Sequence, residues 1–177
     1  MIHGRKATCG VDLVNTHPML DGGRAALIHN GVVQSDTIHN ISTTCDSELL
    51  LRAWDSRGHH GLEEITGYFA FGLMVRRRDG WHVVVARDAN ARLRVGQMDS
   101  GWAWGTTDDA LAIADATPLC DHKAMHAACF APNGECSLVE FKKGQERPTH
   151  QRSLDAAWDV ASGRHWSRSL ISKGGDL

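Results

Sequence analysis

The segment Tyr68-Phe69-Ala70-Phe71-Gly72-Leu73-Met74-Val75 is almost continuously apolar, and it decides the fold. A strand that is apolar at every position, rather than at alternate ones, is typical of a sheet that is covered on both faces. The solvated tip Arg76-Arg77-Arg78-Asp79-Gly80 follows, and Trp81–Asp88 returns as a second apolar strand. The sequence therefore predicts a β-hairpin inside a buried sheet.

Shorter elements flank this hairpin on both sides. Ala25–Ile28 predicts a strand that runs into a tight turn at His29-Asn30-Gly31, because Asn-Gly readily adopts positive φ. Apolar residues recur at helical spacing over Leu49–Trp54, and Thr44 or Asp46 can cap this helix. The other expected elements are a turn at 21–23, a short helix at 62–65, a hairpin at 93–97 and 101–106, a helix at 108–114 and a strand at 137–141. Strand pairs interleaved with helices predict sheets between helical layers, an α+β fold.

Composition excludes several classes of function. A length of 177 residues is expected of one globular domain. The chain carries 19 Lys and Arg against 21 Asp and Glu, a net charge of −2. This charge gives no electrostatic argument for nucleic acid or an anionic membrane as a partner. No apolar run is long enough to span a bilayer. Five irregularly spaced cysteines indicate reduced thiols, so we expect a cytoplasmic protein. We expect no cofactor.

Three polar clusters suit the recognition of a free amino acid. They are Arg5 with Thr8, His29-Asn30-Gly31, and Cys45-Asp46. Arginine can clamp an α-carboxylate, aspartate can pair with an α-ammonium, and an Asn-Gly unit can donate to an oxyanion. Local chemistry alone favours a plainer interpretation, namely a capped helix, a hairpin turn and a surface arginine.

The order of these clusters along the chain resembles class II glutamine amidotransferases. The segments that resemble motifs of this family are His3-Gly4-Arg5-Lys6-Ala7-Thr8-Cys9-Gly10 with Asn15-Thr16-His17-Pro18, Ala26-Leu27-Ile28-His29-Asn30-Gly31-Val32-Val33, Cys45-Asp46-Ser47-Glu48-Leu49-Leu50, Gly67-Tyr68-Phe69-Ala70-Phe71, and Ala86-Arg87-Asp88. The match runs from about Ile2 to Ala114 in the family's order. It implies the N-terminal-nucleophile hydrolase fold, a four-layer αββα sandwich, for a domain over 1–145.

The resemblance implies a glutamine site. Carried over by position, Arg5 would hold the α-carboxylate of glutamine and Asp46 its α-ammonium, while Asn30 and Gly31 would form the oxyanion hole. The remaining residues that would shape the pocket are Thr8, His29 and the segment Asn15-Thr16-His17-Pro18. The implied reaction is hydrolysis of the side-chain amide to glutamate and ammonia.

One part of the family pattern is missing from the printed chain. The family's nucleophile is a cysteine at the mature N-terminus, whose own α-amine serves as the base. Here Met1-Ile2 enters the resemblance late, so we expect an N-terminally truncated domain without its first central strand. Lys6 and Cys9 also depart from the pattern, and an internal Cys9 has no free amine beside it. Either the nucleophile is supplied elsewhere, or the chain is a non-catalytic binding or structural protein on the same fold.

Two further features suggest other roles. A small zinc module could be formed by Cys120, His122, His126, Cys129 and Cys136, with the two histidines on one face of a helix. Their spacing does not fit a zinc finger with two pairs of ligands, so we favour core packing without a metal. The polar extension 146–177 is expected to be partly disordered. Its Trp158 and Trp166 could anchor a protein partner or a second copy of the chain.

Overall fold

The computed structural model describes residues 15–39 and 41–141. They form two antiparallel sheets, with strand orders β1-β2-β3-β4-β8-β9 and β6-β5-β7. The strands of the large sheet are β1 (Met19–Asp21), β2 (Ala25–Gln34), β3 (Thr66–Arg77), β4 (Gly80–Arg87), β8 (His126–Phe130) and β9 (Cys136–Glu140). The other elements are β5 (Arg94–Met98), β6 (Gly101–Gly105), β7 (Thr117–Asp121), helices α1 (Ser47–Arg57) and α2 (Asp108–Ile113), and a 3₁₀ helix over Gly58–Glu64.

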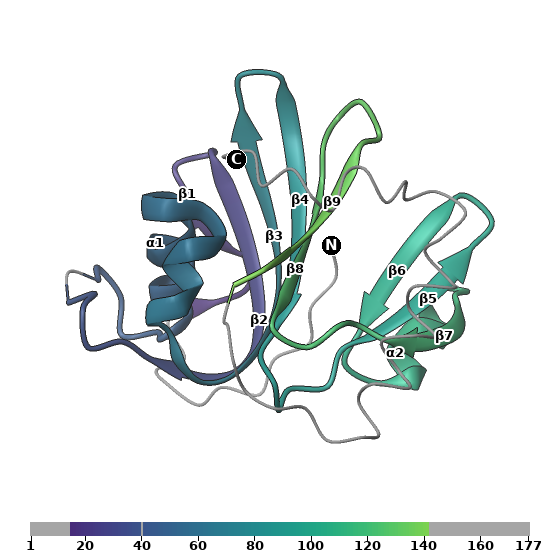
Figure 1. The fold of residues 1–177 in the computed structure, drawn as a ribbon, viewed down its shortest axis with the longest axis horizontal. Helices are drawn as coiled ribbons and strands as arrows, with labels where there is room; N and C mark the ends of the chain where they lie inside the picture. The colour runs from purple at the N-terminus through teal and green to yellow at the C-terminus, as the bar shows by residue number, and fades with distance from the viewer. Residues whose placement is uncertain (1–14, 40, 142–177) are drawn as a thin grey trace.

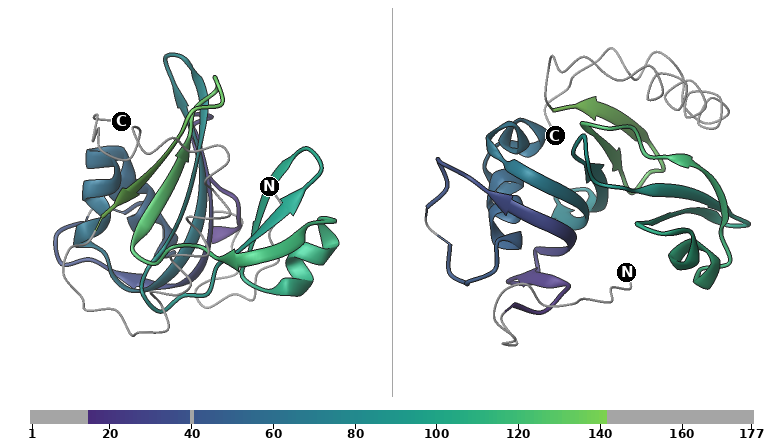
Figure 2. Two further views of the ribbon diagram at one scale, coloured as in Figure 1. Left: turned by 45° about the vertical axis from the view of Figure 1, so that its right-hand side comes forward. Right: turned by 90° about the horizontal axis from the view of Figure 1, so that it is seen from below.

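These elements stack in four layers. Helix α1 covers one face of the large sheet, the small sheet lies against the other face, and α2 packs outside the small sheet (Figures 1 and 2). Leu111 of α2 lies beside Gly96 and Gly105 on the outer face of the small sheet, which leaves Val95 to face inward. The α+β sandwich expected from the sequence is confirmed.

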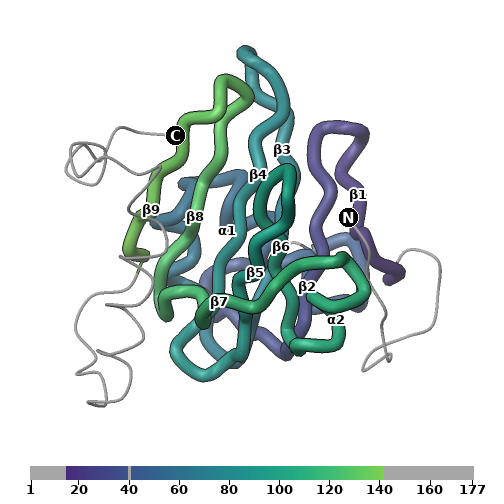
Figure 3. Tube along the Cα trace, turned by 90° about the vertical axis from the view of Figure 1, so that its right-hand side faces the viewer, coloured from purple at the N-terminus to yellow at the C-terminus, as the bar shows by residue number. Residues whose placement is uncertain are grey.

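The apolar hairpin is buried for the expected reason. Alternate residues of β3, Phe69, Phe71 and Leu73, pack in one cluster with α1, whereas Ala70 packs on the opposite face with Leu93. A strand between two layers of the core needs apolar side chains on both of its faces. Towards β1 the small sheet no longer covers the large one (Figure 3), and several large apolar side chains are exposed there: Leu20, Val32 and Tyr68.

Arg87 and Asp88 hold the two sheets together. The buried Arg87 guanidinium donates from Nε to the carbonyl of His122 at 2.6 Å and from Nη1 to that of Ala91 at 2.8 Å. Asp88 Oδ1 accepts from the backbone N–H groups of Ala91 at 2.6 Å and Phe69 at 3.3 Å. Because Ala91 and His122 lie beside the small sheet, this polar junction fixes the position of that sheet against β3 and β4.

Two local expectations are wrong. His29-Asn30-Gly31 is not a turn, because β2 continues through it to Gln34 and pairs with β3 along its whole length. Gly31 is required by close packing instead, since a Cβ there would lie 1.9 Å from the carbonyl oxygen of Tyr68. His122 and His126 are not on a helix: His122 follows β7 and His126 begins β8, two strands that the sequence analysis did not predict.

Candidate functional site

One edge of β2 is open beside the Asn-Gly pair. Among the described residues, β1 pairs with β2 only at Ala25, Ala26 and Leu27, so no described strand lies beside the edge over 31–33. We call this segment the open edge of β2. It carries the residues for which the sequence suggests an oxyanion hole.

Gly31 directs its backbone N–H towards the open edge. Its register partner on β3 is Phe69, whose N–H and carbonyl both bond with Asp88 on the far side. In an antiparallel sheet, opposite residues either exchange both of their hydrogen bonds or point both groups away from each other. Gly31 and Phe69 therefore form a pair without mutual hydrogen bonds, and the Gly31 N–H points away from β3, towards the open edge.

The carboxylate of Asp46 lies at the same edge. Asp46 occupies the N-cap position of α1, but its side chain makes no capping hydrogen bond, so the expectation that it caps the helix is wrong. Instead, Oδ2 accepts from the backbone N–H of Val33 at 2.8 Å. Val33 is two residues beyond Gly31 on the strand, and N–H groups two residues apart leave a strand by the same edge. The structure thus places the carboxylate of Asp46 on the same edge of β2 as the outward N–H of Gly31, two residues further along the strand.

Two imidazoles meet on the first residue of α1. Ser47 Oγ lies 2.9 Å from His29 Nδ1 and 3.0 Å from His17 Nε2, and the Cys45 thiol donates to it over 3.4 Å. Both His29 and Ser47 are buried. This cluster joins the segment before β1 to β2 and to the start of α1. His17 and His29, expected to shape a pocket, are therefore held together by a serine that the sequence analysis did not single out.

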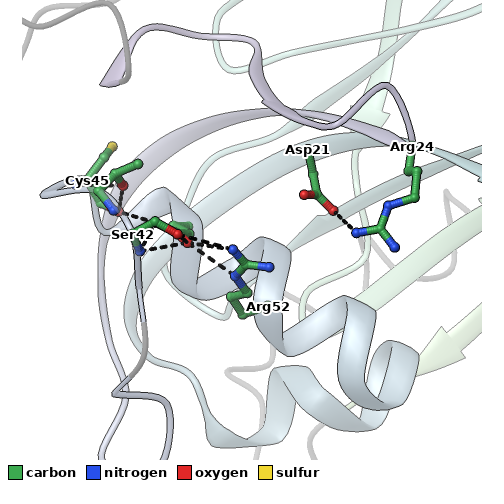
Figure 4. Close-up of polar contacts among 7 residues, drawn as sticks. Asp21, Arg24, Ser42, Cys45 and Arg52 are labelled. Atoms are coloured by element: carbon green, nitrogen blue, oxygen red, sulfur yellow. Dashed lines mark hydrogen bonds and ion pairs between the residues drawn. The ribbon is translucent and has the colours of Figure 1, made fainter.

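Glu48 fixes the loop that leads into α1. Its buried carboxylate accepts from the backbone N–H groups of Ser42 at 2.8 and 2.9 Å and Thr43 at 2.8 Å, and from Ser42 Oγ at 3.0 Å. One turn further along the helix, Arg52 donates to the same carboxylate from Nε at 3.1 Å and Nη2 at 2.9 Å. Figure 4 shows Arg52 reaching from α1 towards the loop at Ser42.

These contacts decide the ionisation of Glu48. Burial alone would raise its pKa, but the hydrogen bonds from Ser42, Thr43 and Arg52 outweigh burial and lower the pKa from 4.5 to about 2. A carboxylate that accepts several N–H bonds is strongly favoured in its charged form. Glu48 is therefore ionised throughout the physiological range.

The depressed pKa of Glu48 predicts how stability depends on acid. Its contribution is fully present above about pH 4.5 and is lost as the pH falls towards 2, since the unfolded chain binds the proton more readily. We expect Glu48→Gln to lower the free energy of unfolding by up to about 3 kcal/mol at pH 7 and by much less near pH 2. Urea titrations of the wild-type protein and the variant across this range measure the difference. A constant difference at every pH would contradict the assignment.

The structure brings together only part of the expected site. His29, Gly31 and Asp46 lie at or beside the open edge, and the exposed side chain of Asn30 stands on the face of β2 opposite α1. Asn15 is buried and donates from Nδ2 to Thr44 Oγ1 at 2.9 Å, which ties the segment before β1 to the loop before α1. Arg5, Thr8 and Cys9 lie outside the described residues.

The cysteines considered as zinc ligands do not all lie in one part of the core. Cys129 packs on the α1 side of the large sheet and Cys120 packs between the two sheets. Burial raises the pKa of Cys120 to about 11 and that of Cys129 to about 12, and burial lowers the pKa of His122 to about 3. Within residues 15–39 and 41–141, no group of three or more His, Cys, Asp or Glu side chains is arranged to hold a metal ion.

In the described part of the chain, neither helix has the length and apolar character needed to cross a membrane.

Comparison with known proteins agrees with this architecture. A family model described as "Glutamine amidotransferase domain" matches residues 1–133. Two solved structures share the fold. One is a glutamine phosphoribosylpyrophosphate amidotransferase from B. subtilis, complexed with ADP and GMP, with a TM-score of 0.62 and 21% identity over 82% of this chain. The other is described as the allosteric regulatory enzyme of purine biosynthesis, with a TM-score of 0.62 and 20% identity over 78% of this chain.

The chain spans only 35% and 34% of the lengths of these two structures. A search of curated protein sequences gave no match. The family match covers well over half of the 177 residues. The chain therefore belongs to the glutamine amidotransferase domain family.

Proposed function

We propose that this chain provides the glutamine-binding part of a class II glutamine amidotransferase site. One observation supports the proposal: two backbone N–H groups, those of Gly31 and Val33, point to the open edge of β2. The Val33 N–H binds the Asp46 carboxylate, and the Gly31 N–H lies two residues away on the same edge. A carboxylate beside the open edge of β2 suits a ligand with an ammonium group and a polarised carbonyl.

Each proposed contact has a distinct chemical role. Asp46 pairs with the α-ammonium of glutamine, and Arg5 clamps the α-carboxylate through its two-pronged guanidinium. The Gly31 N–H and the Asn30 side-chain amide donate to the amide oxygen of the substrate, whose negative charge grows as the carbonyl carbon becomes tetrahedral. His17, Ser47 and His29 hold the start of α1 beside β2.

The reaction that such a site serves is hydrolysis of the glutamine side-chain amide. In the mechanism that the family resemblance implies, a cysteine thiolate attacks the amide carbon, ammonia leaves, and water then releases glutamate from the thioester. Of the four described cysteines, Cys45, Cys120 and Cys129 are buried and Cys136 lies in β9. The proposal therefore assigns the nucleophile to none of these four thiols but to a cysteine at a mature N-terminus, as the resemblance implies.

The free thiols also support a proposed location. Within the part of the chain that the structure describes, Cys120, Cys129 and Cys136 form no disulfide. Unpaired thiols are typical of reducing compartments, so we propose that the protein acts in the cytoplasm.

Titration with L-glutamine tests the proposed function. We expect saturable binding with a dissociation constant near 1 mM, about −4 kcal/mol, because binding without chemistry uses only the anchoring contacts. Asp46→Asn should weaken binding about tenfold through loss of the charge-assisted contact with the ammonium group. Its melting temperature should change little, since the Asp46 side chain does not cap α1 and asparagine can still accept from Val33.

Asp55→Asn is the matched control, because Asp55 is an exposed residue of the same helix and should leave affinity unchanged. If the wild-type protein shows no saturable binding, the non-catalytic structural role replaces the glutamine site. If Asp46→Asn and Asp55→Asn bind equally well, Asp46 is not the ammonium anchor.

A further inference from the structure

The loop that ends in Asp46 is held from two sides. On one side, the Glu48 carboxylate accepts hydrogen bonds from the backbone N–H groups of Ser42 and Thr43. On the other side, Thr44 accepts from Asn15, and Asp46 accepts from Val33 on β2. The intervening residues are also tied locally, since the Cys45 N–H donates to Thr43 Oγ1 at 3.2 Å. A shift of Ser42 and Thr43 would therefore be transmitted to Asp46.

We propose that Glu48 is a positioning residue for the glutamine site, whose carboxylate fixes the loop 42–45 and thereby sets Asp46 against the open edge of β2. This inference rests on the proposed function and assigns a role to a residue that would not itself touch glutamine. Its side chain faces the loop and Arg52, whereas the proposed ammonium anchor is Asp46, two residues earlier.

The chemistry of this anchor requires a carboxylate rather than an amide. Oε1 accepts from Ser42 and Arg52, while Oε2 accepts from the N–H groups of Ser42 and Thr43. A glutamine at position 48 has only one acceptor oxygen, so its NH₂ group would face a donor, either the backbone N–H groups or the guanidinium. One side of the anchor is then lost without any change in side-chain size.

Arg52 completes the arrangement. Its guanidinium lies one helical turn from Glu48 and donates to Oε1 through two nitrogens. Its Nη2 also lies 3.4 Å from Ser42 Oγ, so the same group contacts both the carboxylate and the loop. Charge-assisted contacts of this kind are about twice as strong as neutral ones, which explains how a loop without regular structure can be held in one position.

The test compares two ligands that differ only at the group that Asp46 would bind. The probes are L-glutamine and glutaramate, which is glutamine without its α-ammonium group, titrated into the full chain and followed by NMR. We expect Glu48→Gln to weaken L-glutamine about tenfold and to leave glutaramate within about twofold of its wild-type affinity. In the double variant Asp46→Asn/Glu48→Gln, the loss for L-glutamine should not exceed that of Asp46→Asn alone, because both changes remove the same contact.

Glu63→Gln is the matched control, since it makes the same change at an exposed glutamate of the 3₁₀ helix and should leave both affinities unchanged. Arg52→Gln gives a second, milder variant in case Glu48→Gln does not fold, because Arg52 is 37% exposed, and it should weaken L-glutamine selectively but less strongly. Equal weakening of both ligands, or no weakening of either, would overturn the positioning role. Failure of the wild-type protein to bind L-glutamine would instead overturn the proposed function on which this inference rests.

Discussion

Replacing Gly31 with alanine is expected to remove most of the stability of the domain. A Cβ at position 31 would lie 1.9 Å from the Tyr68 carbonyl oxygen and 2.9 Å from the Cα of Phe69, so β2 and β3 would have to separate at the centre of the large sheet. The backbone φ of +141° adds strain for any residue with a side chain. We expect a loss of about 4 kcal/mol or more, which lowers the melting temperature by roughly 10 °C.

Gly101→Ala separates the clash from the backbone strain. Gly101 has a similar φ of +155°, but it lies at the start of β6 and a Cβ there would meet nothing within 4 Å. We expect the Gly101 variant to lose only a fraction of the stability that the Gly31 variant loses, measured by thermal and urea unfolding. Equal losses would show that conformation, and not the close approach of β3, requires glycine at position 31.

Arg87→Met is also expected to cause a large loss of stability. It removes two short hydrogen bonds from the guanidinium to the carbonyls of Ala91 and His122 and leaves two acceptors at the junction of the sheets without this donor. Loss of buried charge-assisted hydrogen bonds predicts a cost of about 3 kcal/mol. Chemical unfolding of the variant measures this cost.

The control for this prediction is Arg92→Met. Arg92 is 58% exposed and lies 3.6 Å from the Asp108 carboxylate, and exposed ion pairs contribute about 0 to 1 kcal/mol. A neutral or stabilising Arg87→Met would contradict the account of the junction, because it would show that the cost of burying the guanidinium exceeds the worth of its hydrogen bonds.

Sequence patterns predicted those helices and strands whose burial imposes a clear pattern of apolar side chains. The apolar run at Tyr68–Val75 identified a strand with two covered faces, and the spacing of Leu49–Trp54 identified α1, because burial imposes these patterns directly. β7 and β8 were missed because both are short. Pro118 in β7 is typical of a loop, and the two alanines of β8 have a low strand propensity.

The sequence predicted the candidate site only where the type of a residue, by itself, indicates what it can bind. Arg, Asp and Asn-Gly indicated an amino-acid site, but Asn30-Gly31 was mistaken for a turn because the need for glycine comes from the Tyr68 backbone, 37 residues away. Likewise, the acidic pair Asp46 and Glu48 is typical of a helix start. Their separate roles depend on which backbone groups they reach, Val33 for Asp46 and Ser42 with Thr43 for Glu48.

The central claim is that glutamine binds at the open edge of β2, and the most direct test is the position of the amide signals that move on titration. L-glutamine is added to the ¹⁵N-labelled protein with assigned backbone amides. We expect saturable shifts at Gly31, whose N–H is the proposed oxyanion donor, and at Val33, whose N–H binds the Asp46 carboxylate. Shifts confined to the separate groove lined by Thr37, Ile38, His39, Arg52, Asp55 and Ser56, or no saturable shift at Gly31 and Val33, would contradict the claim.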